Sequence, residues 1–184
     1  MGTPKLLLPW GETTVLGHTL HQLRQSQVDA CLLISGHLAQ AITVIAAAHQ
    51  VPVIHNPAYA EGEMLSSLQV GLCHLPAGTD AVLVVLADQP LVGPEIVNRL
   101  LVAYEAGHGD LIAPTYQGIR GNPVLIGRPY FAELLALPWG HAPRTLLRRH
   151  LDRLYLVPVE SAAILQDLDR PEDYERYRPS ARKK

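Results

Sequence analysis

The stretch Ala81-Val82-Leu83-Val84-Val85-Leu86-Ala87-Asp88-Gln89-Pro90 decides the fold. Its first six residues are apolar without alternation, which predicts a strand over Ala81–Leu86 that is buried on both faces. The run Cys31-Leu32-Leu33-Ile34 has the same character. Strands buried on both faces are typical of a mainly parallel sheet covered by helices on both sides. The polar end of the stretch then follows the carboxyl end of a strand, where open α/β sheets bind ligands.

Outward from this stretch, short apolar runs alternate with helical patterns along the chain. Leucines recur on one helical face, for example at Leu16, Leu20 and Leu23. We expect strands at Ala30–Ser35, Val51–His55, Ala81–Leu86, Asp110–Pro114, Pro123–Gly127 and Leu154–Val159. We expect helices at Thr14–Gln25, Leu38–His49, Met64–Leu75, Pro94–Ala106, Tyr130–Leu137 and Arg144–His150. The predicted class is a three-layer, doubly wound α/β fold in a single domain over residues 1–177, followed by a basic tail over 178–184.

Composition excludes several classes of protein. The 184 residues are 48% hydrophobic and 17% charged, which indicates one folded domain and excludes a disordered chain. A net charge of −2 gives no basic field for nucleic-acid binding. The longest apolar run, Ala81 to Ala87, is far shorter than the roughly 20 residues of a membrane span. The two cysteines lie in apolar stretches without metal-ligand spacing, so we expect no disulfide framework and a cytoplasmic location.

Asp88 is the sharpest candidate for chemistry. A carboxylate directly after a buried strand, with Pro90 two residues later, is aimed at the ligand-binding edge of the sheet. Carboxylate oxygens are ligands that hard cations such as Mg²⁺ prefer. Alternatively, Asp88 closes a turn or caps the helix that begins near Pro94, and the residue type alone does not separate these interpretations.

Asp167 and Asp169 form a second acidic pair, one residue apart. In an extended chain their side chains point to opposite sides, so one of them reaches the ligand-binding edge more easily than the other. Asp169 stands before Pro171 and is typical of an N-cap for a terminal helix through Tyr177. Asp167 is freer to bind a metal.

Four other residues carry weaker signals. Lys5 is either a phosphate clamp or a solvated lysine, and Ser66 either binds an anion at a helix start or caps that helix. His37 follows a strand and could line the cleft. Arg144 lies in a loop and is suited to bidentate contact with a phosphate or carboxylate, or to a surface ion pair.

Together these motifs resemble the MobA-like nucleotidyltransferase family, and most closely its molybdenum cofactor cytidylyltransferase branch. The resemblance covers roughly Met1 to Tyr177. Six motifs in order carry it: Met1–Pro9, Gly36-His37, Asn56–Gly62 with Ser66, Leu86–Pro90, Gly121–Pro123 and Asp167–Asp173.

The resemblance implies transfer of a nucleoside monophosphate from an NTP to a phosphorylated acceptor, with release of pyrophosphate. The NTP expected first is CTP, and the expected acceptor is molybdopterin. It implies Mg²⁺ as the cofactor and a molybdenum hydroxylase as a further partner. The implied catalytic residues are Lys5 and Asp88. The implied nucleotide-binding residues are Gly2, Lys5, Gly36, His37 and Ser66, the acceptor-binding residues Gly121, Asn122 and Arg144, and the metal ligands Asp88, Asp167 and Asp169.

The sequence departs from the family at two places. The acceptor loop, usually Gly-Asp-x-Gly-Ala-Arg, reads Gly140-His141-Ala142-Pro143-Arg144 here. The family also has a strand and the loop Leu-Ala-Ala-Gly-x-Ser-x-Arg before Met-Gly. We therefore expect an N-terminally shortened reading of a longer protein, with the strands at Ala30–Ser35 and Ala81–Leu86 either separated by a gap or drawn together. Alternative functions are a catalytically impaired protein that binds or delivers the cofactor, and a related transferase with another acceptor.

Overall fold

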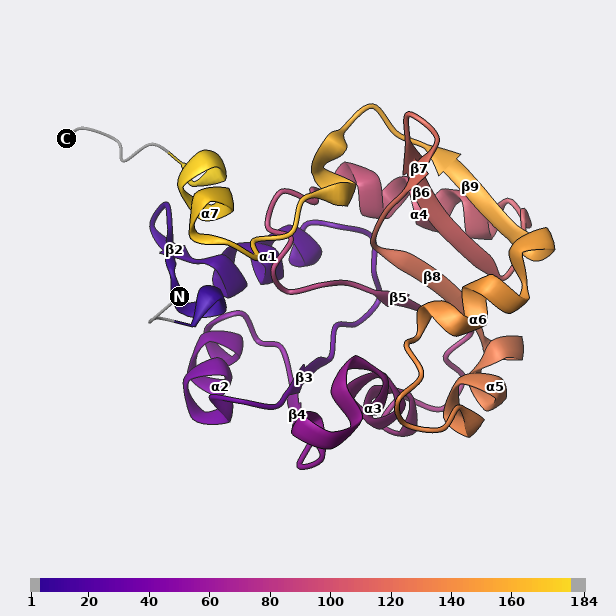
Figure 1. The fold of residues 1–184 in the computed structure, drawn as a ribbon, viewed down its shortest axis with the longest axis horizontal. Coiled ribbons are helices and arrows are strands. Elements are labelled where there is room, and N and C mark those ends of the chain that lie inside the picture. The colour runs from indigo at the N-terminus through magenta and orange to yellow at the C-terminus, as the bar shows by residue number, and fades with distance from the viewer. Residues whose placement is uncertain (1–3, 180–184) are drawn as a thin grey trace.

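The computed structural model describes residues 4–179 (Figure 1). Gly2 and the tail residues Arg182, Lys183 and Lys184 lie outside the described residues. The helices are α1 (Val15–Arg24), α2 (Ala39–Ala48), α3 (Tyr59–Cys73), α4 (Pro94–Glu105), α5 (Phe131–Ala136), α6 (Arg144–Arg149) and α7 (Pro171–Tyr177). Short 3₁₀ turns occur at η1 (Lys5–Leu7), η2 (Arg128–Tyr130), η3 (Leu151–Arg153) and η4 (Ala162–Leu165). None of the helices over residues 4–179 is long and apolar enough to cross a membrane.

The strands of residues 4–179 form three separate sheets. A small hairpin pairs β1 (Pro9–Trp10) with β2 (Thr13–Thr14), and β3 (Leu33–Ser35) pairs in parallel with β4 (Val53–His55). The largest sheet has the order β5-β8-β6-β7, with β9 parallel to β6. Its strands are β5 (Ala81–Val84), β6 (Leu111–Tyr116), β7 (Ile119–Arg120), β8 (Val124–Gly127) and β9 (Leu154–Pro158). Among the described strands, β3 and β5 are not hydrogen-bonded to each other, so of the two expected arrangements the structure has the separated one.

The expected mainly parallel sheet is a mixed sheet. β8 runs antiparallel to both β5 and β6. The reason lies in the short connection from β6 to β8 over residues 117–123, because a parallel crossover needs about a dozen residues or more. β8 is buried along its whole length, so its apolar character alone did not reveal its direction.

Helices cover both faces of the largest sheet, which confirms the three-layer α/β class. Along β6, Leu111 and Ala113 pack on one face with Leu134 of α5, in a core that also includes residues of α3 and α6. Ile112 points to the opposite face and packs with Leu100 of α4. This alternation is the period of two that a strand imposes on its side chains. α1 and α2 supply the core that covers β3 and β4.

The expected strands and helices are all present, with ends that differ by a few residues. The largest difference is in α3, which begins at Tyr59 instead of Met64. The helix is interrupted at Glu63, whose φ of 49° and ψ of −143° are not helical. The apolar periodicity of Leu65, Leu68 and Leu72 marks only the part of α3 after this interruption.

Gly121 offers a test of how β6 and β8 hold the segment before Asp167. A Cβ at Gly121 would lie 2.3 Å from the carbonyl oxygen of Ile164, whereas at Gly118 (φ +79°) it would meet nothing within 4 Å. We expect Gly121→Ala to lower the free energy of unfolding by about 1–3 kcal/mol, because the Ile164 backbone must move. Gly118→Ala meets no neighbouring atom and should cost about 1 kcal/mol, the lower end of the cost of a positive φ, and less than Gly121→Ala.

The measurement is thermal and urea unfolding of both variants beside the unchanged chain. Equal losses of stability in the two variants would contradict the packing role of Gly121.

Candidate active site

Lys5 joins two carboxylates that come from distant parts of the chain. Its Nζ donates a hydrogen bond to Oδ2 of Asp88 at 2.5 Å and one to Oδ1 of Asp169 at 2.9 Å. Lys5 is the first residue of η1, Asp88 follows β5, and Asp169 precedes α7. The structure therefore brings together three of the residues that the sequence marked as candidates.

Backbone and side-chain contacts hold the loop of Asp88 in place. The backbone NH of Leu168 donates to the carbonyl oxygen of Asp88 at 3.1 Å. On the other side, Oγ1 of Thr19 in α1 donates to the carbonyl oxygen of Ala87 at 3.2 Å. α4 has Gly93 at its N-cap position and no side-chain cap, so the capping interpretation of Asp88 is wrong.

Asp169 does not cap the terminal helix either. α7 has Arg170 at its N-cap position, and the backbone NH of Arg170 donates to Oδ2 of Asp173 at 2.9 Å. The capping interpretation that the local sequence favoured for Asp169 is therefore wrong, because Asp173 does this work and leaves the Asp169 carboxylate to Lys5.

Asp167 faces a different partner from Asp169. Its Oδ1 accepts a hydrogen bond from Nε2 of Gln89, whose side chain is buried. Burial raises the pKa of the Asp167 carboxyl above its usual range, and the charges of Asp88 and Asp169 raise it further. The hydrogen bond from Gln89 and the charge of Lys5 oppose this rise in the pKa.

The ammonium of Lys5 stays charged despite its partial burial. Burial alone lowers its pKa, but hydrogen bonds and charge attraction from Asp88 and Asp169 outweigh it, so the pKa is raised above the usual value. Lys5 thus supplies the positive charge that two neighbouring carboxylates need.

The donor chemistry of the site fits a divalent cation. In the part of the chain that the structure describes, no group of three His, Cys, Asp or Glu side chains is arranged to hold a metal. Asp88 and Asp169 nevertheless already converge on one cation, the Lys5 ammonium. Carboxylate oxygens are the donors that Mg²⁺ and Mn²⁺ prefer, so these two residues could hold such an ion once Lys5 moves aside.

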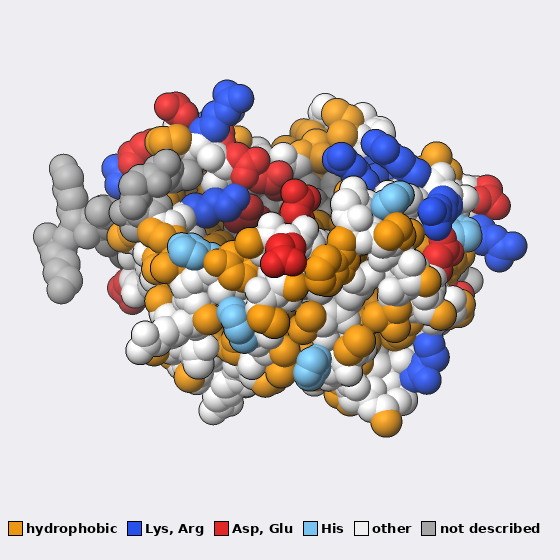
Figure 2. All heavy atoms as spheres, turned by 60° about the horizontal axis from the view of Figure 1, so that its bottom comes forward, with side chains coloured by type: hydrophobic (Ala, Val, Ile, Leu, Met, Phe, Trp, Pro, Cys, Tyr) orange, Lys and Arg blue, Asp and Glu red, His pale blue; other side chains and the backbone are white. Residues whose placement is uncertain are grey.

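The segment that carries Asp167 and Asp169 also borders a groove. A groove of about 330 Å³ is lined by Leu165, Gln166, Asp167, Asp169, Arg170, Asp173 and Tyr177. Figure 2 shows acidic side chains gathered near the centre of the view, where the surface dips between its left and right parts.

The residues expected to bind the nucleotide lie around the start of α3. Ser66 is buried, and its Oγ accepts a hydrogen bond from Nδ2 of Asn56 at 2.8 Å and donates one to the carbonyl oxygen of Glu63 at 3.0 Å. Within residues 4–179, Oγ of Ser66 accepts from no backbone NH, and α3 has Ala58 at its N-cap position without a side-chain cap, so the capping alternative for Ser66 is wrong. Gly36 lies against the ring of Tyr59, and the exposed His37 has its ring 6.3 Å from that of Tyr59.

The residues expected on the acceptor side are Gly121, Asn122 and Arg144. Within residues 4–179 none of them forms a hydrogen bond with Lys5 or with the aspartates around it. The backbone NH of Asn122 donates to the carbonyl oxygen of Ile164 at 3.0 Å, and Gly121 packs against the same residue. Both therefore position the chain shortly before Asp167. Arg144 is exposed at the start of α6.

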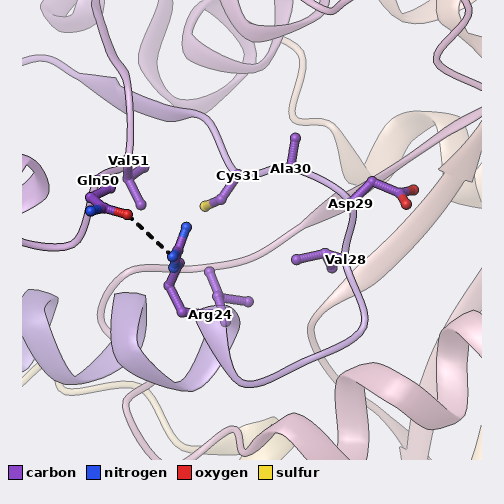
Figure 3. A pocket seen from close by; sticks show the side chains of 8 residues that line it. Arg24, Val28, Asp29, Ala30, Cys31, Gln50 and Val51 are labelled. Atoms are coloured by element: carbon purple, nitrogen blue, oxygen red, sulfur yellow. Dashed lines mark hydrogen bonds between the residues drawn. The ribbon is translucent and has the colours of Figure 1, made fainter.

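A second, smaller cavity lies beside the start of the β3 segment (Figure 3). It measures about 90 Å³, and Arg24 donates to Oε1 of Gln50 at 3.5 Å on its wall. Burial raises the pKa of the Cys31 thiol in this wall, so the thiol is neutral and a poor nucleophile. The cavity is at the amino end of the strand, opposite the edge where open sheets bind ligands.

Sequence reasoning missed Gln89 and Thr19 as supports of the site. Gln89 directly follows Asp88, but nothing in its local pattern distinguishes a buried partner of Asp167 from a turn residue. Thr19 lies within α1, where a hydroxyl facing the buried side of an apolar helix was the available signal.

Residues 1–156 match the family described as the MobA-like NTP transferase domain. The chain belongs to this family. It is 27% identical to the molybdenum cofactor cytidylyltransferase of Escherichia coli over 95% of this chain and 86% of the relative. This membership confirms the family resemblance, and the chain is a nucleotidyltransferase.

Solved structures agree with this assignment. The crystal structure of Rv0371c from Mycobacterium tuberculosis matches with a TM-score of 0.81 and 29% identity, over 96% of this chain and 90% of that one. A manganese complex of Rv0371c matches with a TM-score of 0.77 and 28% identity, over 95% and 91% of the two chains. A nucleotidyl transferase from Methanothermobacter matches with a TM-score of 0.79 and 28% identity, over 95% and 83%. Divalent metal binding is thus found among the relatives of this nucleotidyltransferase.

The raised pKa of Asp167 makes a stability prediction. A carboxyl whose pKa is higher in the folded than in the unfolded state destabilises the fold at pH values above the folded pKa, and this cost disappears as the pH falls below the unfolded value of about 3.9. Asp167→Asn should therefore raise the Tm at pH 7 by about 1–2 °C, with partial exposure limiting the gain. The gain should shrink toward pH 4.

Differential scanning calorimetry at the two pH values measures the effect. Asp152→Asn is the matched control, because Asp152 is exposed and remote from Lys5. A lower Tm for Asp167→Asn at pH 7 would show that the Gln89 contact outweighs the cost of the charge.

Proposed function

We propose that this nucleotidyltransferase transfers a cytidylyl group from CTP to a molybdopterin-type acceptor and releases pyrophosphate, for delivery to a molybdenum hydroxylase. Similarity to the cytidylyltransferase of E. coli over nearly the whole chain supports CTP and this acceptor. The observation that carries the proposal is the ammonium of Lys5 held between two carboxylates at the end of β5.

The proposed reaction needs charge neutralisation more than a nucleophile from the protein. A phosphate oxygen of the acceptor attacks the α-phosphorus of CTP and forms a phosphoanhydride bond. The bond from the α-phosphorus to its bridging oxygen breaks, and pyrophosphate leaves with the electron pair. Such in-line transfer depends on positioning and on positive charge around the phosphates.

Each residue of the cluster has a defined part in this proposal. Lys5 leaves its carboxylates and binds the β- and γ-phosphates, which stabilises the leaving group as its charge grows. Asp88 and Asp169 are the residues that would hold Mg²⁺, which would neutralise the phosphates when bound. Asp167, linked to the buried Gln89, fixes the segment that carries Asp169.

Pyrophosphate release tests the substrate assignment. We expect release from CTP, in the presence of molybdopterin and Mg²⁺, to be at least tenfold faster than from GTP or ATP, and to require the acceptor. Faster release from GTP would identify guanylyl transfer instead. No release from any of the three nucleotides would favour the cofactor-delivery alternative.

The role of Asp88 is tested in the same assay. Asp88→Ala and Asp88→Asn should each lower the rate by about 100-fold or more, because both remove the charge that holds a hard cation. Asp152→Asn should leave the rate unchanged, and circular dichroism should show all three variants folded. Activity within a fewfold of the unchanged chain in Asp88→Ala would contradict the assignment.

Replacing Lys5 should weaken binding of the nucleotide and strengthen binding of the divalent cation. Without its ammonium, CTP loses a charge-assisted contact, so Lys5→Gln should weaken CTP binding by about tenfold and acceptor binding much less. The same change removes the cation that competes for Asp88 and Asp169, so Mn²⁺ alone should bind more tightly than to the unchanged chain.

Isothermal titration with CTP and electron paramagnetic resonance with Mn²⁺ measure the two effects of Lys5→Gln. Arg153→Gln, at an exposed position away from the cluster, should change neither. Loss of both affinities together would indicate a disturbed fold and contradict the proposed exchange of cations.

A further inference from the structure

Trp139 is a large exposed side chain that is nevertheless held in place. Its exposed fraction is 51%, whereas the other tryptophan, Trp10, is 3% exposed. Nε1 of Trp139 donates to Oε1 of Gln69 in α3 at 3.1 Å. Nε2 of Gln69 in turn donates to the carbonyl oxygens of Leu134 and Leu137 at 3.0 and 2.9 Å. The polar edge of the indole is therefore fixed while much of the ring stays accessible.

The ring lies against the first part of α3. A Cβ at Gly62 would lie 2.3 Å from Cβ of Ser66 and 3.2 Å from Cδ2 of Trp139, so the absence of a side chain at Gly62 leaves room first for Ser66 and also for the indole. Two further large side chains within three residues of Gly62, Tyr59 and Met64, are 38% and 48% exposed. The contact of Trp139 with Gly62 thus joins two separate parts of the chain, and the Gly62 part carries two more exposed large side chains.

The backbone at this place is strained. Glu63, next to Gly62, has a φ of 49°, a conformation that a residue with a side chain rarely adopts. Such strain persists only where the surrounding structure fixes it, and it gathers at ligand-binding sites. Here the fixing contacts come from Asn56, whose Nδ2 donates to Ser66 and Ser67 and whose Oδ1 accepts from the backbone NH of Ala58.

The position in the fold is also that of a ligand site. α3 follows the carboxyl end of β4, and in open α/β sheets ligands bind beyond the carboxyl ends of the strands. Trp139 itself directly precedes Gly140–Arg144, the loop in which the sequence departs from the family pattern.

We infer that Trp139 is the stacking surface for a planar nitrogen heterocycle of one substrate, either the base of the nucleotide or the pterin of the acceptor. The inference rests on the proposed function for the class of ligand. An indole offers a wide flat face to such rings, and loss of a stacking aromatic weakens binding of a base by about tenfold or more.

Two variants of Trp139 separate stacking from a general effect on the fold. Trp139→Phe keeps an aromatic face and should bind the stacked ligand within about threefold of the unchanged chain. Trp139→Leu keeps an apolar side chain without that face and should bind it at least tenfold more weakly. Tyr155→Leu, which changes an exposed aromatic residue on β9, is the matched control and should alter neither affinity.

The probes are CTP with Mg²⁺ and, separately, neopterin, each titrated calorimetrically into the full chain. Quenching of tryptophan fluorescence, excited at a wavelength the nucleotide does not absorb, gives a second readout that Trp139→Phe should lose. An effect confined to CTP assigns the base to Trp139, and one confined to neopterin assigns the pterin. If Trp139→Leu binds both probes as the unchanged chain does, the inference is overturned, whereas normal pyrophosphate release in that variant would leave the proposed function intact.

Discussion

The contact of one ammonium with two carboxylates is the interaction on which the candidate active site depends. Lys5, Asp88 and Asp169 lie in three segments that share no secondary-structure element. Without the positive charge between them, the carboxylates of Asp88 and Asp169 would repel each other at short range, in surroundings that screen less than bulk water. The side chain of Asp88 is only 20% exposed, so its charge has little solvent to compensate it.

The rest of the fold fixes the places from which these side chains reach one another. Thr19 of α1 holds the residue before Asp88, and Leu168 binds the carbonyl of Asp88 itself. Asn122, at the entry to β8, holds Ile164 in the segment that leads to Asp167. The mixed sheet thus supports the site through β8 as well as β5. Asn122, shortly before β8, binds the backbone of Ile164 and so fixes the segment that leads to Asp167 and Asp169.

Sequence patterns predicted the elements well because burial of a strand or helix face is a local, periodic property. They marked Asp88 as a candidate site residue for a topological reason, since the carboxyl end of a buried strand lies at the edge of the sheet where ligands bind. The capping interpretation of Asp169 was wrong, because the cap signal before Pro171 is also local and is satisfied by Asp173, the third residue of the helix. The ion pair of Asp169 with Lys5 spans 164 residues, and no local pattern reports a contact of that kind.

Asp167 shows why a site of this kind retains groups that a stability argument alone would remove. Its carboxyl is partly buried among like charges, and the resulting rise in its pKa means that the folded state disfavours its ionised form. The buried side-chain amide of Gln89 donates a hydrogen bond to this carboxyl. Gln89 directly follows Asp88, so the bond also links Asp167 to the loop of Asp88. A chain selected for stability alone would place a neutral side chain there. The excess of negative charge around Lys5 instead fits the proposed exchange of the ammonium for a divalent cation when a triphosphate binds, because the two carboxylates need a positive charge at each stage.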